Sequence, residues 1–300
     1  MTRRVRIFQV DAFTTRLFTG NPAGVVLDAH DLAEQELLAI ARELRGGDTA
    51  FVLPADAVDH DLRVRFFTPR AETAFVGHAT LAVHAVREAL GLTLCHRQKQ
   101  RNGIVETGRF DGPLGPRYFF SQPPPPLHGP FEGDRLHEVL AALGLQPDEL
   151  DPRCPAVVAG ERGARALIAV RDGSMLARLR PDLAQLTALS AAGCPPGYFV
   201  FTRSPAVPDC DTEARMFCPA IGIDEDPVSG NAHALLAMHL YTLGLLTNRQ
   251  GHIAFVGRQG HHVSRPGEVG VRIDTTDGRV RSVRIDGAAV IAFKADADLG

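Results

Sequence analysis

The segment Arg65-Phe66-Phe67-Thr68-Pro69 is followed 150 residues later by Arg215-Met216-Phe217-Cys218-Pro219. Downstream of the first block, Gly77-His78-Ala79 opens an apolar stretch, and Gly230-Asn231-Ala232 opens a second one of the same length. The spacing of 150 residues between the first pair of blocks is nearly kept in the second, where it is 153, and this favours an internal duplication over chance similarity of common residues. Two like halves, each directing the start of a helix inward, would form a shared cleft.

Composition restricts the class of protein. The chain has 300 residues, of which 45% are hydrophobic and 22% charged, which is typical of one large or two medium globular domains. A net charge of −3 gives no basic footprint for nucleic acid or for a membrane surface. Five cysteines without a C-x-x-C pair argue against a disulfide framework or a structural zinc site, and indicate a cytoplasmic protein. No signal peptide or apolar run of membrane-spanning length is recognisable.

Hydrophobic periodicity predicts a strand-rich chain with one long helix in each half. Helices are expected over Leu32–Leu44, ending at Gly46-Gly47, and over Ala79–Leu90, Leu136–Leu143, Leu183–Ser190 and Ala232–Leu243. Strands are expected over Val5–Phe13, Ala23–Leu27, Thr49–Leu53, Leu62–Phe67, Ile104–Phe110, Arg117–Ser121, Ala156–Ala159, Ala166–Val170, Tyr198–Thr202, Thr212–Phe217, Ile253–Val256, Val269–Ile273 and Val280–Phe293. Strict β-α-β alternation is missing, so a doubly wound parallel sheet is disfavoured.

Four consecutive prolines, Pro123–Pro126, predict a linker between an N-terminal half, 1–122, and a C-terminal half, 127–300. The final strand is a candidate to pack across onto the N-terminal half. The helices at Ala79 and Ala232 are apolar nearly all round, which is typical of an enclosed helix. A sheet curled around each helix would enclose it, as would a position between two layers.

The two helix starts are candidate anion sites, because first-turn amides are unpaired and glycine allows close approach. Gly77 and Gly230 would then receive a substrate carboxylate, although either could equally be a plain glycine near a helix cap. His78 lies beside the first start, and Asp226 precedes the second by four residues. Their alternative roles are a buried histidine and a turn-forming aspartate.

Asp48 is the third candidate, because it precedes the apolar strand at Thr49. An acid at the mouth of a buried strand can act as a general acid or base; an exposed turn aspartate is the alternative. The corresponding residue in the second half is Tyr198, so only the first half carries an acidic residue at this position. Nucleotide-binding glycine motifs and H-E-x-x-H are missing from the sequence, so neither a cofactor nor a metal site is predicted.

Taken together, five motifs in order resemble the PhzF-like family of phenazine biosynthesis. They are Phe18–Val26, Asp48–Phe51, Arg65–Pro69, Gly77–Thr80 and Asp226–Ala232. The resemblance implies the diaminopimelate-epimerase-like α+β fold, with two pseudo-symmetric halves, each a curled β-sheet around a central α-helix and with the active site between them. It also implies a homodimer that acts on a small carboxylate.

The resemblance further implies a mechanism. A family glutamate shuttles a proton within trans-2,3-dihydro-3-hydroxyanthranilate without a cofactor, and Asp48 matches that residue. His78 and Asp226 match substrate-binding residues, Asn231 replaces a family serine, and Gly77, Ser229 and Gly230 complete the predicted binding set. Relatives that epimerise carry cysteines where this chain has Val76 and Ser229.

Three hypotheses follow for the activity. The first is a cofactor-independent isomerase moving a proton within a small carboxylic acid. The second is a catalytically impaired member of the fold that binds small carboxylates. The third is an amino-acid epimerase that uses Asp48 and a different second base.

Overall fold

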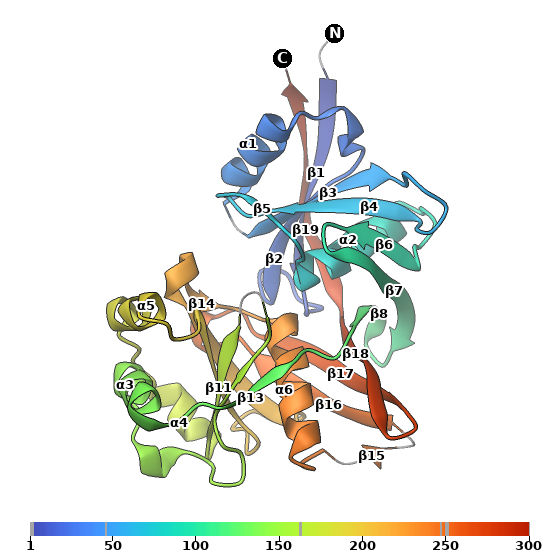
Figure 1. Ribbon diagram of the computed structural model, residues 1–300. Coiled ribbons are helices and arrows are strands. Elements are labelled where there is room, and N and C mark those ends of the chain that lie inside the picture. Colours follow the sequence, from blue (N-terminus) through green and yellow to red (C-terminus); the bar gives the residue numbers. More distant parts are fainter. Residues whose placement is uncertain (1–2, 46, 162–163, 247, 250–251, 300) are drawn as a thin grey trace. The chain divides into compact units, whose positions relative to one another are not determined.

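The computed structural model describes residues 3–45, 47–161, 164–246, 248–249 and 252–299 (Figure 1). Contacts between these residues divide into two compact units: Met1–Gln122 with Asp286–Gly300, and Pro123–Ile285. None of the described helices is long and apolar enough to cross a membrane.

The first unit contains two helices, α1 (Glu34–Leu44) and α2 (Gly77–Ala89). Its strands are β1 (Arg3–Ala12), β2 (Asn21–Val26), β3 (Asp48–Pro54), β4 (Leu62–Phe67), β5 (Glu72–Thr73), β6 (Arg97–Gln100), β7 (Gly103–Gly112), β8 (Gly115–Gln122) and β19 (Ala289–Leu299). Strand β2 pairs in parallel with β3, and β4 with β6, while the other pairs are antiparallel.

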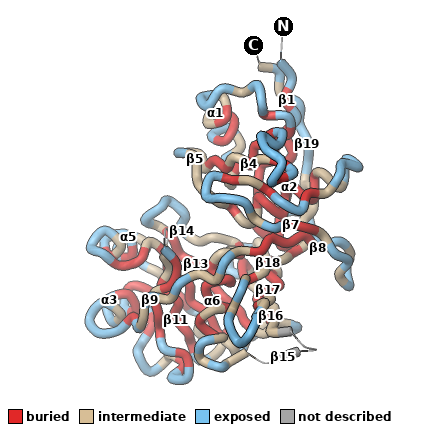
Figure 2. The backbone as a smooth tube through the Cα atoms, turned by 45° about the vertical axis from the view of Figure 1, so that its right-hand side comes forward, coloured by how far each residue is buried: buried red, intermediate tan, exposed pale blue. Residues whose placement is uncertain are grey.

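Helix α2 packs against strands from both ends of this sheet. It contacts β19 and β1 at one end, β8 at the other, and β2 and β3 between them. Eight consecutive residues, Ala79–Val86, are buried (Figure 2). Full burial of a Leu or Val side chain contributes about 1.5–3 kcal/mol, so the apolar content of the helix accounts for its enclosure.

The second unit contains helices α3 (Gly133–Leu143), α4 (Gly173–Arg178), α5 (Leu183–Ala191) and α6 (Gly230–Thr242). Its strands are β9 (Leu127–Pro130), β10 (Val157–Ala159), β11 (Arg165–Val170), β12 (Gly197–Thr202), β13 (Thr212–Cys218), β14 (Ile223–Asp226), β15 (Asn248–Arg249), β16 (His252–Gln259), β17 (Gly267–Thr276) and β18 (Arg279–Gly287). Helix α6 contacts β9 and β17, and is buried along most of its length.

The two units repeat one strand order. Parallel pairs β2–β3 and β4–β6 in the first correspond to β11–β12 and β13–β16 in the second. The repeated arginines also behave alike: Arg65 lies 5.1 Å from the centre of the Phe67 ring and binds Glu72. Arg215 lies 5.0 Å from the Phe217 ring and binds Glu225. The predicted α+β fold, with a curled sheet around a helix in each half, is confirmed.

Several predicted boundaries differ from the structure. Both long helices begin at their glycines, two residues earlier than predicted. Helix α1 ends at Leu44 and Arg45 takes the left-handed conformation, with φ of 39°, in place of the predicted glycine pair; Gly46 lies outside the described residues. The predicted strand Val280–Phe293 is divided between β18 and β19. At the end of β18, a Cβ on Gly287 would lie 2.5 Å from the Phe13 ring.

Candidate active site

Asp48 is the first residue of β3, beside Ala23 of β2 in the parallel register. The preceding residue fixes how closely the two strands approach, because a Cβ on Gly47 would lie 2.1 Å from the carbonyl oxygen of Pro22. Only glycine allows this approach. The Asp48 side chain is 24% exposed, so its carboxylate remains accessible at the end of a buried strand.

His78 is the second residue of α2, and its Nε2 lies 3.9 Å from Oδ2 of Asp48. Its side chain is 14% exposed. Burial lowers the pKa of His78 to about 4, and a hydrogen bond to the Pro22 carbonyl opposes this shift only in part. The ring is therefore neutral near pH 7.

The Pro22 contact also selects the tautomer of His78. No described residue hydrogen-bonds to Nε2, so a bond to the Pro22 carbonyl would have to come from a protonated Nδ1. Nε2 then presents a lone pair toward Asp48. At 3.9 Å Nε2 and Oδ2 are too far apart for a hydrogen bond, but the Nε2 lone pair is oriented to accept one from a protonated carboxyl group.

At the α2 start, Val76 is the N-cap and supplies no side-chain cap to the first-turn amides. An anion could therefore be received there. The space beside Gly77 is already occupied, however: a Cβ there would lie 2.8 Å from the ring of Phe120. Gly77 is thus required for packing, and an incoming ligand must approach the amides from another side.

The second unit supplies the other predicted binding residues. Asp226 ends β14, Ser229 is the N-cap of α6, and Gly230 and Asn231 are its first two residues. The Ser229 hydroxyl accepts a hydrogen bond from the amide of Ala232, at 3.2 Å. This helix start is capped by a side chain, unlike that of α2.

Gln259 organises the α6 start and was missed by the sequence analysis. Its Nε2 donates to the carbonyl of Asp226 at 2.6 Å, and its Oε1 accepts from the amide of Ser229 at 3.0 Å. Gln259 is fully buried. It lies in β16, far along the chain, so only the strand pairing could have identified it.

Tyr198 does not supply a second base at these helix starts, and neither Cys154 nor Cys218 does. Tyr198, the counterpart of Asp48, is buried against α5, where its hydroxyl donates to the Leu186 carbonyl at 3.2 Å. Burial raises the pKa of Cys154 and of Cys218 to about 12. Within the described ranges, no group of three or more His, Cys, Asp or Glu side chains could hold a metal ion.

A comparison of the chain with models of protein families agrees with these sequence and structural observations. The model of the phenazine biosynthesis-like proteins, PhzC-PhzF, matches residues 10–295. The chain belongs to the PhzC-PhzF family.

Relatives in this family extend over nearly the whole chain. The uncharacterized isomerase YddE of Escherichia coli (strain K12) is 37% identical over 298 residues, covering 97% of each chain. An uncharacterized isomerase of Clostridium acetobutylicum is 32% identical over 300 residues, covering 99% of each. A PhzF-family phenazine biosynthesis protein of Bacillus anthracis has the same fold, with a TM-score of 0.86 at 24% identity over 98% of this chain and 99% of that one.

Proposed function

We propose that this PhzC-PhzF protein is a cofactor-independent isomerase that moves a proton between two carbons of a small carboxylic acid. The Asp48 carboxylate removes a proton from one carbon, and the electron pair of that C–H bond shifts into an adjacent double-bond system. The same carboxyl group returns the proton to another carbon. Substrate and product have the same atoms and electrons, so no oxidant, reductant or cofactor enters the balance.

The observation that carries this proposal is the pairing of Asp48 with a neutral His78 whose Nε2 faces the carboxyl group at 3.9 Å. A shuttling acid must be stable in both protonation states. Nε2 offers an acceptor to the protonated state, while partial exposure solvates the carboxylate. The names of the relatives, uncharacterized isomerases, support the same reaction class.

In the proposal, the uncapped amides of α2 at Gly77 receive the substrate carboxylate. The resemblance assigns further substrate-binding roles to Asp226, Ser229, Gly230 and Asn231 at the start of α6. Asp48 is one methylene shorter than the glutamate implied by the resemblance, and Asn231 is bulkier than a serine. Both differences favour a substrate related to, but different from, dihydro-hydroxyanthranilate.

The proposal is tested by proton exchange in D₂O, followed by NMR, on dihydro-hydroxyanthranilate and a panel of small unsaturated and amino carboxylic acids. Asp48→Asn keeps the shape of the side chain but cannot accept a proton. We expect it to lower the exchange rate by about 10²–10⁴-fold. The matched control is Glu43→Gln, which makes the same chemical change at an exposed site on α1.

Equal exchange by wild type and Asp48→Asn would overturn the role of Asp48. Saturable binding by the wild type without exchange of any tested acid would instead support the catalytically impaired binding protein. Homodimerisation stays a prediction, which size-exclusion chromatography with light scattering would check.

A further inference from the structure

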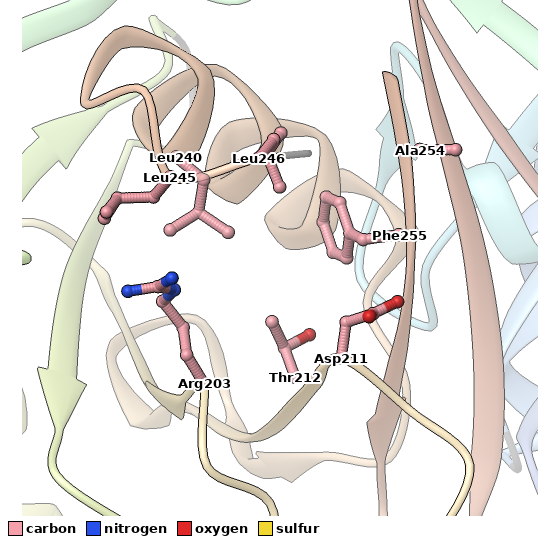
Figure 3. A pocket seen from close by; sticks show the side chains of 8 residues that line it. All are labelled: Arg203, Asp211, Thr212, Leu240, Leu245, Leu246, Ala254 and Phe255. Atoms are coloured by element: carbon pink, nitrogen blue, oxygen red, sulfur yellow. The ribbon is translucent and has the colours of Figure 1, made fainter. Parts of the chain in front are cut away.

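The second unit contains a cavity of about 200 Å³ at the C-terminal end of α6 (Figure 3). Leu240, in its wall, follows Gly230 by ten residues, which is about 15 Å along the axis of an α-helix. The cavity is therefore separate from the helix start assigned to the proposed reaction. Its charged and polar lining residues are Arg203, Asp211 and Thr212, and its large apolar ones are Leu240, Leu245, Leu246 and Phe255.

One side of the cavity is polar and cationic. Arg203 lines one side of the cavity, with its guanidinium group below Leu245 in Figure 3, and its Nη1 is buried without a hydrogen-bond acceptor among the described residues. Its Nη1 forms an ion pair with Oδ2 of Asp151 at 4.0 Å, which is too long for a hydrogen bond, and that oxygen accepts a hydrogen bond from Arg153. A buried donor that lacks an acceptor costs about 1–3 kcal/mol, so an incoming oxygen atom would relieve this cost.

Thr212 gives a second unsatisfied group beside Arg203. It is 2% exposed, and its hydroxyl has no hydrogen-bond partner in the described part of the chain. It lies in β13, opposite Gly257 of β16 in the parallel register. Two buried polar groups with unused hydrogen-bonding capacity therefore line one small cavity.

The opposite side is apolar. Three leucines from the end of α6 and the residues after it lie across the cavity from Arg203 in Figure 3, and Phe255 closes a third side. Small-molecule sites commonly combine such an apolar wall with a few convergent polar groups. An Arg guanidinium group matches a carboxylate in charge and in planar geometry.

We propose that this cavity is a second ligand site, which binds a small monocarboxylate with an apolar tail. The carboxylate pairs with Arg203, and the tail lies against Leu240, Leu245 and Leu246. The volume sets the size, because pockets for drug-sized ligands span about 300–1,000 Å³. A branched or aromatic acid of about eight non-hydrogen atoms suits the smaller space.

Asp211 limits the charge of the ligand. It also lines the cavity, and its Oδ2 accepts a hydrogen bond from the amide of Val256 at 2.8 Å. Its carboxylate is thus directed toward β16, yet its charge remains near that of any bound anion. A single carboxylate is favoured over a dianion such as phosphate, because repulsion grows with ligand charge.

The test is calorimetric titration of the full chain with 4-methylpentanoate, alongside 4-methylpentanamide, which lacks the charge, and acetate, which lacks the tail. We expect saturable binding of 4-methylpentanoate and at least tenfold weaker binding of the other two. Arg203→Gln should weaken the binding of 4-methylpentanoate at least tenfold. Leu246→Trp, which adds bulk over the cavity, should abolish it.

Two controls identify the site. Arg135→Gln removes an exposed arginine of the same unit and should leave the affinity unchanged. Arg203→Gln should keep the proton-exchange rate of the wild type, which separates this site from the proposed reaction. Circular dichroism verifies the folding of each variant.

The proposal is overturned if Arg203→Gln and Leu246→Trp, both folded, bind 4-methylpentanoate with wild-type affinity. It is also overturned if the wild type binds the acid and the amide equally well. The comparison of ligands on the wild type decides the question even if a variant fails to fold.

Discussion

At the residue scale, the position of Asp48 depends on Gly47, because glycine has no side chain. A Cβ there would lie 2.1 Å from the carbonyl oxygen of Pro22, the atom that also accepts the hydrogen bond from His78. We expect Gly47→Ala to separate β2 from β3 and to destabilise the fold by about 1–3 kcal/mol, as overpacking does. The loss of activity should exceed the loss of folded protein.

Urea denaturation and the deuterium exchange assay would measure the two effects separately. An unchanged unfolding midpoint would mean that Pro22 moves aside without cost. Unchanged exchange would mean that the spacing of Asp48 and His78 is not critical.

Only part of this site could be predicted from residue types. The repeat and the resemblance singled out Asp48 and His78, which the structure brings within 3.9 Å of each other. Pro22 was missed because it acts through its backbone carbonyl, which every residue possesses. The ring of Phe120 beside Gly77 was missed because it arrives from β8 through the folding of the sheet.

At the scale of elements, two glutamines at equivalent places in the repeat differ in their bonding. Gln259 of β16 bonds to two backbone groups at the α6 start. Gln100 of β6 is 4% exposed, but its side-chain nitrogen and oxygen lack hydrogen-bond partners among the described residues. We expect Gln259→Leu to destabilise the protein by about 1–3 kcal/mol, because it removes the acceptor of the Ser229 amide and a donor to the Asp226 carbonyl.

Gln100→Leu is the matched variant, and it should be neutral or stabilising because it removes unsatisfied polar atoms from the interior. Denaturation midpoints of both variants check the pair. Equal destabilisation would show that the hydrogen bonds of Gln259 contribute nothing beyond packing.

The same comparison explains which elements could be predicted. Helices α2 and α6 and the buried strands carry long apolar patterns, and periodicity identified them. Strands β6 and β14 are short and polar, Arg97–Gln100 and Ile223–Asp226. β6 is a strand because it pairs with β4, which is distant in the sequence, and β14 is a strand because it folds back on β13. Periodicity within a short segment cannot reveal either pairing.

At the scale of the whole molecule, buried histidines make stability depend on pH. Burial lowers the pKa of His78, His84 and His233 to about 4. In the unfolded chain these rings bind protons below about pH 6.5, whereas the folded protein excludes those protons until about pH 4. The free energy of unfolding should therefore fall as the pH decreases through this window, by about 1.4 kcal/mol per pH unit for each ring.

His84→Leu isolates one of these contributions. His84 is fully buried, and neither ring nitrogen has a hydrogen-bond partner among the described residues. We expect little change in stability at pH 7.5 and a smaller loss than the wild type at pH 5, measured by urea denaturation. The control is His137→Gln, because His137 is exposed. If the free energy of unfolding of His84→Leu depended on pH as that of the wild type does, the contribution assigned to His84 would be contradicted.

The pairing of β1 with β19 has a consequence for biosynthesis. Arg3 lies opposite Leu299, so the two strands come from opposite ends of the chain. The second unit, Pro123–Ile285, is continuous, and all of it leaves the ribosome before the last strand does. During translation one edge of β1 stays unpaired until β19 has been synthesised, whereas the second unit is already able to fold. The first unit therefore completes its sheet after the second unit has been synthesised, and the unpaired edge of β1 is prone to aggregation until β19 has been added.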